Sequence, residues 1–174
     1  LSVLLKDRNT EAAVQYLEKV THSTSTSAPL TFCEAYYVDV LLRYYYSCAE
    51  DLHIPMTVHA NVPTKPGVPE EDLCVILGNI LENAFNASTP QNQRRITVAM
   101  ICQEGTVCIE VKNTFKGELV PDGKSFYSSK EKGRHGIGLS SVRSMAEKYS
   151  GDVWLNTEPG ENGVNVFSIQ VLLF

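Results

Sequence analysis

Amide and carboxylate side chains line one face of a predicted helix near the middle of the chain. In the segment "DLCVILGNILENAFNA", residues 72–87, a polar stripe recurs at helical neighbour spacing and consists of Asn79, Glu82, Asn83 and Asn86. Asparagine is a poor helix former, so three of them on one stripe indicate that their carbonyl oxygens have a use there. Oxygen ligands suit magnesium, held by one or two side chains and by substrate phosphates. An ordinary solvated helix face is the alternative.

A glycine-rich segment stands directly before a second predicted helix, residues 138–149, in "KGRHGIGLSSVRSMAEKYSG". Backbone N–H groups at the start of a helix, with no Cβ at Gly136 or Gly138, form an anion site that the helix dipole reinforces. Most such glycines only make tight turns, and this segment is neither a Walker loop nor a dinucleotide fingerprint. Combined with the polar stripe, however, it supplies the second half of a magnesium-nucleotide pocket.

The elements that must position these two features can be predicted from hydrophobic periodicity. Helices are expected at about 10–20 and 34–52, separated by a Ser/Thr-rich break that ends at Pro29. A half-buried strand is expected at 56–62, where the period changes to two, and Pro69 then opens the helix that runs to Ala87. The expected apolar face of that helix consists of Leu73, Ile76, Leu77, Ile80, Leu81, Ala84 and Phe85.

Four further strands are expected in the second half of the chain. Residues 95–103 and 106–113 form a predicted hairpin that turns at Glu104 and Gly105, and the last two strands lie at about 152–157 and 163–173. A glycine-dotted loop is expected from Lys116 to His135.

Composition excludes several classes of protein. The chain has 174 residues, of which 43% are hydrophobic, which suits one globular domain with a sizeable core. Its net charge is −5 and it has no basic run, so a nucleic-acid partner is not expected. Its five cysteines are odd in number and contain no C-x-x-C pair, which indicates reduced, buried thiols rather than disulfides or a zinc site.

The segments "ILGNILENAFNAS" and "RHGIGLSSVRSMAEKYSGDVWLNTEPGENGVNVFSIQVLLF" resemble the N box and the final glycine box of a known ATPase domain. Sensor histidine kinases, DNA gyrase, heat-shock protein 90 and the MutL repair proteins share this domain. The resemblance covers roughly residues 52–174. Upstream, "LLKDRNTEAAVQYLEKV" and "EAYYVDVLLRYYYSCAEDLHIPMTVHANVP" resemble the dimerisation segment and connection of peptide-sensing kinases of the accessory gene regulator type.

The resemblance implies a fold and a domain organisation. It implies an α/β two-layer sandwich, in which helices cover one face of a mixed β-sheet, preceded by N-terminal helical segments. Residues 1–52 would be partial dimerisation helices and a connection, and residues 53–174 the ATP-binding catalytic domain.

The resemblance also assigns roles to the polar stripe. Asn83 matches the asparagine that coordinates magnesium, and Asn79 stands one turn earlier. Gyrase-like hydrolases carry a glutamate general base at that earlier position, whereas histidine kinases commonly carry Asn or His. Asparagine cannot take a proton from water, so Asn79 favours phosphotransfer. Glu82 is expected to act beside Asn79 in catalysis, by orienting magnesium-bound water or the acceptor.

The loop from Gly117 to His135 resembles the mobile lid of the family, with Phe126 and Tyr127 as its few apolar anchors. The N–H groups around Gly138 would bind phosphates, and lid cations would assist. The nucleotide-binding residues that the resemblance implies are Asn79, Asn83, Asn86, Asn113, Lys130, Arg134, His135, Gly136, Ile137, Gly138 and Leu139.

Two positions depart from the family pattern. The family's D-x-G-x-G box, whose aspartate accepts the adenine amino group, reads "EVKNTFKGE" here, so Asn113 is the expected replacement. Many kinases carry Lys or Arg three residues after the magnesium asparagine, and here that residue is Asn86. Lys130, Lys132 or Arg134 on the lid could supply the missing cation.

The function that the resemblance implies is that of a histidine kinase domain in a two-component sensor. It would transfer the γ-phosphoryl of ATP, with Mg²⁺, to a histidine on a dimerisation helix, for relay to a response regulator. The full-length protein would be a homodimer, and this chain a cytoplasmic domain joined to the membrane only through an upstream segment. A degenerate nucleotide-binding fold acting as an interaction module, or an ATP-hydrolysing clamp, are the alternatives.

The acceptor histidine is expected just upstream of Leu1. The chain has four histidines, His22, His53, His59 and His135, and none stands where the family carries its acceptor. We therefore expect that the chain does not phosphorylate itself.

Overall fold

The computed structural model describes residues 30–87, 93–116, 119–122, 125–128, 137–160 and 163–174, and only the backbone of 119–122, 125–128 and Ile137. The chain divides into two compact units, Leu1–Leu30 and Thr31–Phe174, and the second contains all the elements below. The helix predicted at 10–20 and the break that ends at Pro29 lie outside the described residues. The functional boundary predicted after residue 52 stays a prediction.

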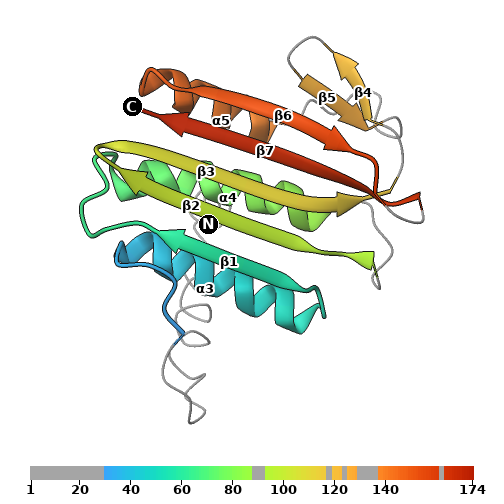
Figure 1. The fold of residues 1–174 in the computed structure, drawn as a ribbon, viewed down its shortest axis with the longest axis horizontal. Helices are drawn as coiled ribbons and strands as arrows, with labels where there is room; N and C mark the ends of the chain where they lie inside the picture. Colours follow the sequence, from blue (N-terminus) through green and yellow to red (C-terminus); the bar gives the residue numbers. More distant parts are fainter. Residues whose placement is uncertain (1–29, 88–92, 117–118, 123–124, 129–136, 161–162) are drawn as a thin grey trace, which may run out of the picture. The chain divides into compact units, whose positions relative to one another are not determined.

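Three helices of the described residues cover one face of a five-stranded sheet (Figure 1). The helices are α3 (Tyr36–Asp51), α4 (Glu70–Asn86) and α5 (Ile137–Lys148). The strands are β1 (Met56–Asn61), β2 (Ile96–Gln103), β3 (Thr106–Phe115), β6 (Asp152–Glu158) and β7 (Asn165–Leu173), in the order β1-β2-β3-β7-β6. Only β1 and β2 pair in parallel, so the sheet is mixed and the predicted two-layer α/β sandwich is confirmed.

Helix α4 lies over the middle of the sheet and carries the polar stripe. It begins after Pro69 with three acidic residues in its first turn, which the positive end of the helix dipole favours. Its predicted apolar face is buried except for Phe85, which is half-buried and packs against Tyr45 of α3 with ring centroids 5.4 Å apart. Burial of this face fixes which way the polar stripe points.

Strand alternation supplies the other side of the core. On β3, Val107, Ile109 and Val111 are fully buried, and Asn113 follows them on the same face. The β2–β3 hairpin turns through Glu104 and Gly105, both with positive φ (51° and 81°), as predicted for a two-residue turn. The register of this hairpin therefore brings Asn113 opposite Ile96.

The prediction of a loop from Lys116 to His135 is wrong in part. Two short strands, β4 (Leu119–Asp122) and β5 (Ser125–Ser128), pair antiparallel within it. The sequence contains the reason, because strong β-formers such as Val120, Phe126 and Tyr127 flank the turn-favouring residues at 122–124. The glycines and charges of this segment concealed the hairpin.

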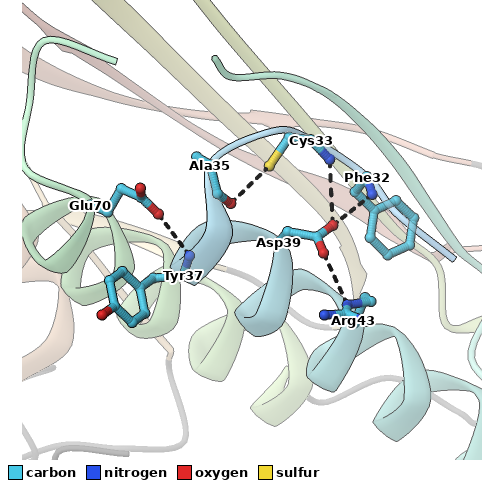
Figure 2. A network of polar contacts seen from close by, with 7 residues as sticks. All are labelled: Phe32, Cys33, Ala35, Tyr37, Asp39, Arg43 and Glu70. Carbon is cyan, nitrogen blue, oxygen red and sulfur yellow. Dashed lines mark hydrogen bonds and ion pairs between the residues drawn. The ribbon is translucent and has the colours of Figure 1, made fainter. Parts of the chain in front are cut away.

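A buried carboxylate fixes the chain where it enters α3 (Figure 2). Asp39 is 6% exposed, and its Oδ1 accepts hydrogen bonds from the backbone N–H of Phe32 at 2.7 Å and of Cys33 at 3.4 Å. Its Oδ2 lies 3.0 Å from Nε of Arg43. The N-terminal end of α3 is bonded to α4 as well, since Oε2 of Glu70 accepts from the N–H of Tyr37 at 2.7 Å.

Candidate functional site

The first turn of α5 lies against the polar stripe of α4. A Cβ added to Gly138 would lie 3.4 Å from Oδ1 of Asn79 and 3.5 Å from Nδ2 of Asn83. Gly138, which belongs to the described end of the glycine-rich segment, therefore lies beside two of the four residues of the polar stripe. Because Gly138 has no side chain, the first turn of α5 lies close to two amide groups, at the positive end of its helix dipole.

The two asparagines are held differently. Nδ2 of Asn79 donates to the carbonyl of Val75, one turn earlier, at 2.8 Å, so its orientation is set by its own helix. Asn79 is half-buried, whereas Asn83, Glu82 and Asn86 are exposed. The side chain of Asn79 thus has a fixed orientation at the border of the site, whereas the exposed side chain of Asn83 is accessible to a ligand.

Asn113 is a buried polar group on the helix-covered face of the sheet. It is 6% exposed and lies between Ile96 of β2 and Phe167 of β7. Its Nδ2 donates to the carbonyl of Thr114 at 3.1 Å, and among the described residues no donor is bonded to its Oδ1. An amide in this position can offer an acceptor to the amino group of a base.

The sequence analysis missed a polar cluster at the other end of the α4–α5 pair. Oδ2 of Asp72, in the first turn of α4, accepts from Nζ of Lys148 at 2.6 Å and from the hydroxyl of Tyr149. Nζ of Lys148 also lies 5.1 Å from the centroid of the Tyr149 ring. We call these three residues the Asp72 cluster.

Electrostatics in the Asp72 cluster favour the charged carboxylate. The hydrogen bond from Lys148, and then the one from Tyr149, hold the pKa of Asp72 below its usual value. The same carboxylate raises the pKa of Lys148 and of Tyr149 above their usual values. All three groups therefore keep their contact-forming protonation states at neutral pH.

Several predicted site residues cannot be placed. Lys130, Arg134, His135 and Gly136 lie outside the described residues, and only the backbone of Ile137 is described. Leu139 is half-buried at the start of α5 and packs against the core. The predicted lid cations and the upstream half of the glycine-rich segment stay predictions.

In the described part of the chain, no group of three or more His, Cys, Asp or Glu side chains could hold a metal ion. Of two described cavities, the larger, about 360 Å³, is lined by residues at the end of α3 and the start of β1, including His53, and the smaller adjoins the end of α4. Neither is lined by Gly138, Asn79 or Asn83.

Burial raises the pKa of four thiols among the described residues, those of Cys33, Cys74, Cys102 and Cys108. Burial, and then Asp39, raise the pKa of Cys33 to about 11, and burial, and then Glu70, raise that of Cys74 to about 12. The prediction of buried thiols is only partly right, because four cysteines are half-buried and Cys108, on the outer face of β3, is exposed. No helix of the described residues is long and apolar enough to cross a membrane.

Comparisons with known proteins bear on the family and the fold of the chain. Residues 70–172 match the model of the GHKL domain family. The fold is similar to that of the mycobacterial sensor histidine kinase MprB, with 20% identity and a TM-score of 0.54 over 79% of this chain and 92% of that one. A nucleotide-free catalytic domain of the histidine kinase ThkA gives 19% identity and a TM-score of 0.51, over 79% and 95% of the two chains.

A third solved structure is matched over less than a third of its own length. ShkA, solved full-length in complex with AMPPNP, gives 19% identity and a TM-score of 0.52 over 78% of this chain but 29% of ShkA. At these identities the likeness concerns the fold. A search of curated proteins found no match. The resemblance to the peptide-sensing subgroup stays a prediction.

Proposed function

Because the chain belongs to the GHKL domain family, we propose that it binds ATP with magnesium between α4 and α5 and donates the γ-phosphoryl group to a histidine. The observation that carries the proposal is the approach of Gly138 to Asn79 and Asn83. It brings an N–H-rich helix start beside two side-chain amides, Asn79 through its Oδ1 and Asn83 through its Nδ2. Backbone N–H groups and amide oxygens are the two kinds of group that a magnesium-bound triphosphate needs.

Each residue of the proposed site that the structure describes has one role. The first turn of α5 binds phosphate oxygens through its backbone N–H groups, for which Gly138 leaves the approach open. Asn83 offers its exposed side-chain oxygen to magnesium, and the fixed Asn79 borders the same site. When bound, the metal neutralises charge on the phosphates. The side-chain oxygen of Asn113 accepts a hydrogen bond from the amino group of adenine.

The residues at Asn79 and Glu82 favour transfer of the phosphoryl group to an acceptor over hydrolysis of ATP. Asn79 stands where a hydrolase of this family carries its general base, and an amide cannot remove a proton from water. Glu82 is exposed one turn along the stripe and is proposed to orient the acceptor. Phosphoryl transfer needs positioning and charge stabilisation more than covalent chemistry, and these are the contributions proposed for Asn79 and Glu82.

Replacing the metal ligand tests the site. Asn83→Ala removes an oxygen that a methyl group cannot replace, so we expect it to abolish the magnesium-dependent part of ATP affinity while the domain stays folded. Asn61→Ala, which truncates an exposed amide on β1, is the matched control and should leave the affinity unchanged. Equal magnesium-dependent affinities of Asn83→Ala and the parent in calorimetry would refute the assignment.

Base selectivity tests Asn113 separately. Asn113→Leu leaves the base edge unpaired and should weaken ATP binding by about 1–3 kcal/mol. The parent should bind ATP more tightly than GTP, because an oxygen replaces the amino group on the guanine ring. If the parent binds the two nucleotides equally well, Asn113 does not read the base.

Phosphotransfer is tested with γ-labelled ATP and magnesium. The chain alone should acquire no acid-labile, base-stable label, and the longer sensor that the resemblance implies should acquire it on its dimerisation helix. We propose that the label then passes to a response regulator and that the sensor is a homodimer. Steady phosphate release by the chain would favour the ATP-hydrolysing alternative instead. Label on the chain that disappears in His22→Ala would contradict an upstream acceptor.

A further inference from the structure

Helices α4 and α5 touch through polar groups at two separated points. Gly138, at the start of α5, lies against Asn79 and Asn83, and Lys148 and Tyr149, at its end, bind Asp72. Helix α5 therefore runs antiparallel to α4. Asp72 lies about two to three turns from the two asparagines, or roughly 10–16 Å, which matches the roughly 15 Å between Gly138 and Lys148.

The Asp72 cluster can fix both the rotation and the translation of α5. Its two donors come from consecutive residues, the last residue of α5 and the first residue of the turn that follows it, yet both reach the same carboxylate oxygen. If α5 rotated or slid by one residue, one of the two contacts would be lost. A single ion pair would not impose this restriction, because a lysine side chain can follow a moving partner.

The same end of α5 is also joined to the sheet. The N–H of Phe174, the residue directly after β7, donates to the carbonyl of Tyr149 at 3.0 Å, and within the helix end itself the N–H of Gly151 donates to the carbonyl of Ala146 at 2.9 Å. Helix α5 is therefore anchored at its C-terminal end, while its N-terminal end faces the asparagines.

We propose that Asp72, Lys148 and Tyr149 are positioning residues that set the register of α5 against α4, and so hold Gly138 at the asparagines. Their contribution lies in geometry, because exposed ion pairs add little to the free energy of unfolding. The expected effect on nucleotide affinity rests on the proposed function, whereas the register of α5 against α4 does not.

A ligand-free measurement tests the register. Asp72→Asn and Tyr149→Phe should each shift the NMR resonances of the Gly138 backbone amide and of the Asn79 and Asn83 side-chain amides. Glu71→Gln removes a neighbouring exposed charge from the same helical turn and should leave these resonances in place. Tyr149→Phe removes one hydroxyl and keeps the ring, so it remains informative if Asp72→Asn does not fold. Unchanged resonances in both variants would overturn the proposal.

A nucleotide measurement separates positioning from general damage. Both variants should weaken Mg-ATP by about three- to tenfold and leave adenosine affinity unchanged, because the base is read from β3 and the phosphates from α5. Equal weakening of ATP and adenosine, or unchanged ATP affinity, would contradict the positioning role. If the parent binds neither ligand, the proposed function fails, and the resonances still decide whether the cluster sets the register.

Discussion

Each end of α5 carries a glycine, but packing requires only the glycine at the C-terminal end. A Cβ on Gly151 would lie 1.9 Å from the carbonyl oxygen of Leu172 and 3.2 Å from that of Ala146, both backbone atoms. A Cβ on Gly138 would meet only the side chains of Asn79 and Asn83, no closer than 3.4 Å. At Gly151 the backbone of β7 leaves no room for a side chain, whereas at Gly138 the fold itself has room.

This difference separates folding from function along one helix. A glycine that the fold does not need, at the start of a helix and beside amide side chains, indicates close approach by something other than protein. The opposite end, with Gly151 and the Asp72 cluster, holds the helix in place. We therefore expect a substitution at Gly151 to change mainly the free energy of unfolding, and one at Gly138 to change mainly the affinity for Mg-ATP.

The largest effect is expected for Gly151→Ala. The new methyl group would overlap the Leu172 carbonyl, so β7 or the end of α5 must move, at a cost of about 3 kcal/mol in the free energy of unfolding. Gly78→Ala is the matched control, because no atom lies within 4 Å of its added Cβ. As an alanine inside a helix it should stabilise by about 0.5–1 kcal/mol. Urea unfolding measures both, and a Gly151→Ala domain as stable as the parent would remove the contrast.

Gly138→Ala should show the converse pattern. Its added Cβ makes ordinary contacts, so we expect the free energy of unfolding to change by less than about 1 kcal/mol. The methyl group would nevertheless occupy the approach to the first N–H groups of α5, so the affinity for Mg-ATP should fall at least about tenfold. Thermal unfolding and calorimetry on the same sample separate the two effects. Destabilisation comparable to that of Gly151→Ala would show that Gly138 is needed for folding.

The smallest effect is the pH dependence of the Asp72 cluster. Since the folded-state pKa of Asp72 is lowered, its stabilisation is present at neutral pH and is lost as pH falls below about 4 through that pKa. Since the pKa values of Lys148 and Tyr149 are raised, their share is present below about pH 10 and is lost as pH rises through their folded-state values. The Tm difference between parent and Asp72→Asn should therefore be constant from about pH 5 to 9 and shrink on both sides. A constant difference down to about pH 2 would show that the carboxylate charge is not involved.

Periodicity predicted most of the fold because burial imposes it. The apolar face of α4 and the alternation of β1 each follow from one-sided contact with the core, and both are confirmed. The β4–β5 hairpin was missed because glycines and charges obscure short strands.

Long-range polar contacts could not be predicted in the same way. Asp72 fits the first turn of any helix, so its bonds to Lys148 and Tyr149 leave no local signal. Conversely, the stripe of asparagines was informative because residues unfavourable in a helix must be explained by something other than the helix. The adenine role of Asn113 came from the family resemblance, and the structure adds its burial on the helix-covered face.

Titration of the folded parent domain with ATP, with and without magnesium, tests the central claim most directly. We expect one nucleotide per chain, an affinity that depends on magnesium, and an affinity at least about tenfold weaker in Gly138→Ala, whose free energy of unfolding changes by less than about 1 kcal/mol. A folded parent that binds no ATP in the presence of magnesium would contradict the proposed site between α4 and α5. So would a Gly138→Ala variant that binds Mg-ATP as tightly as the parent.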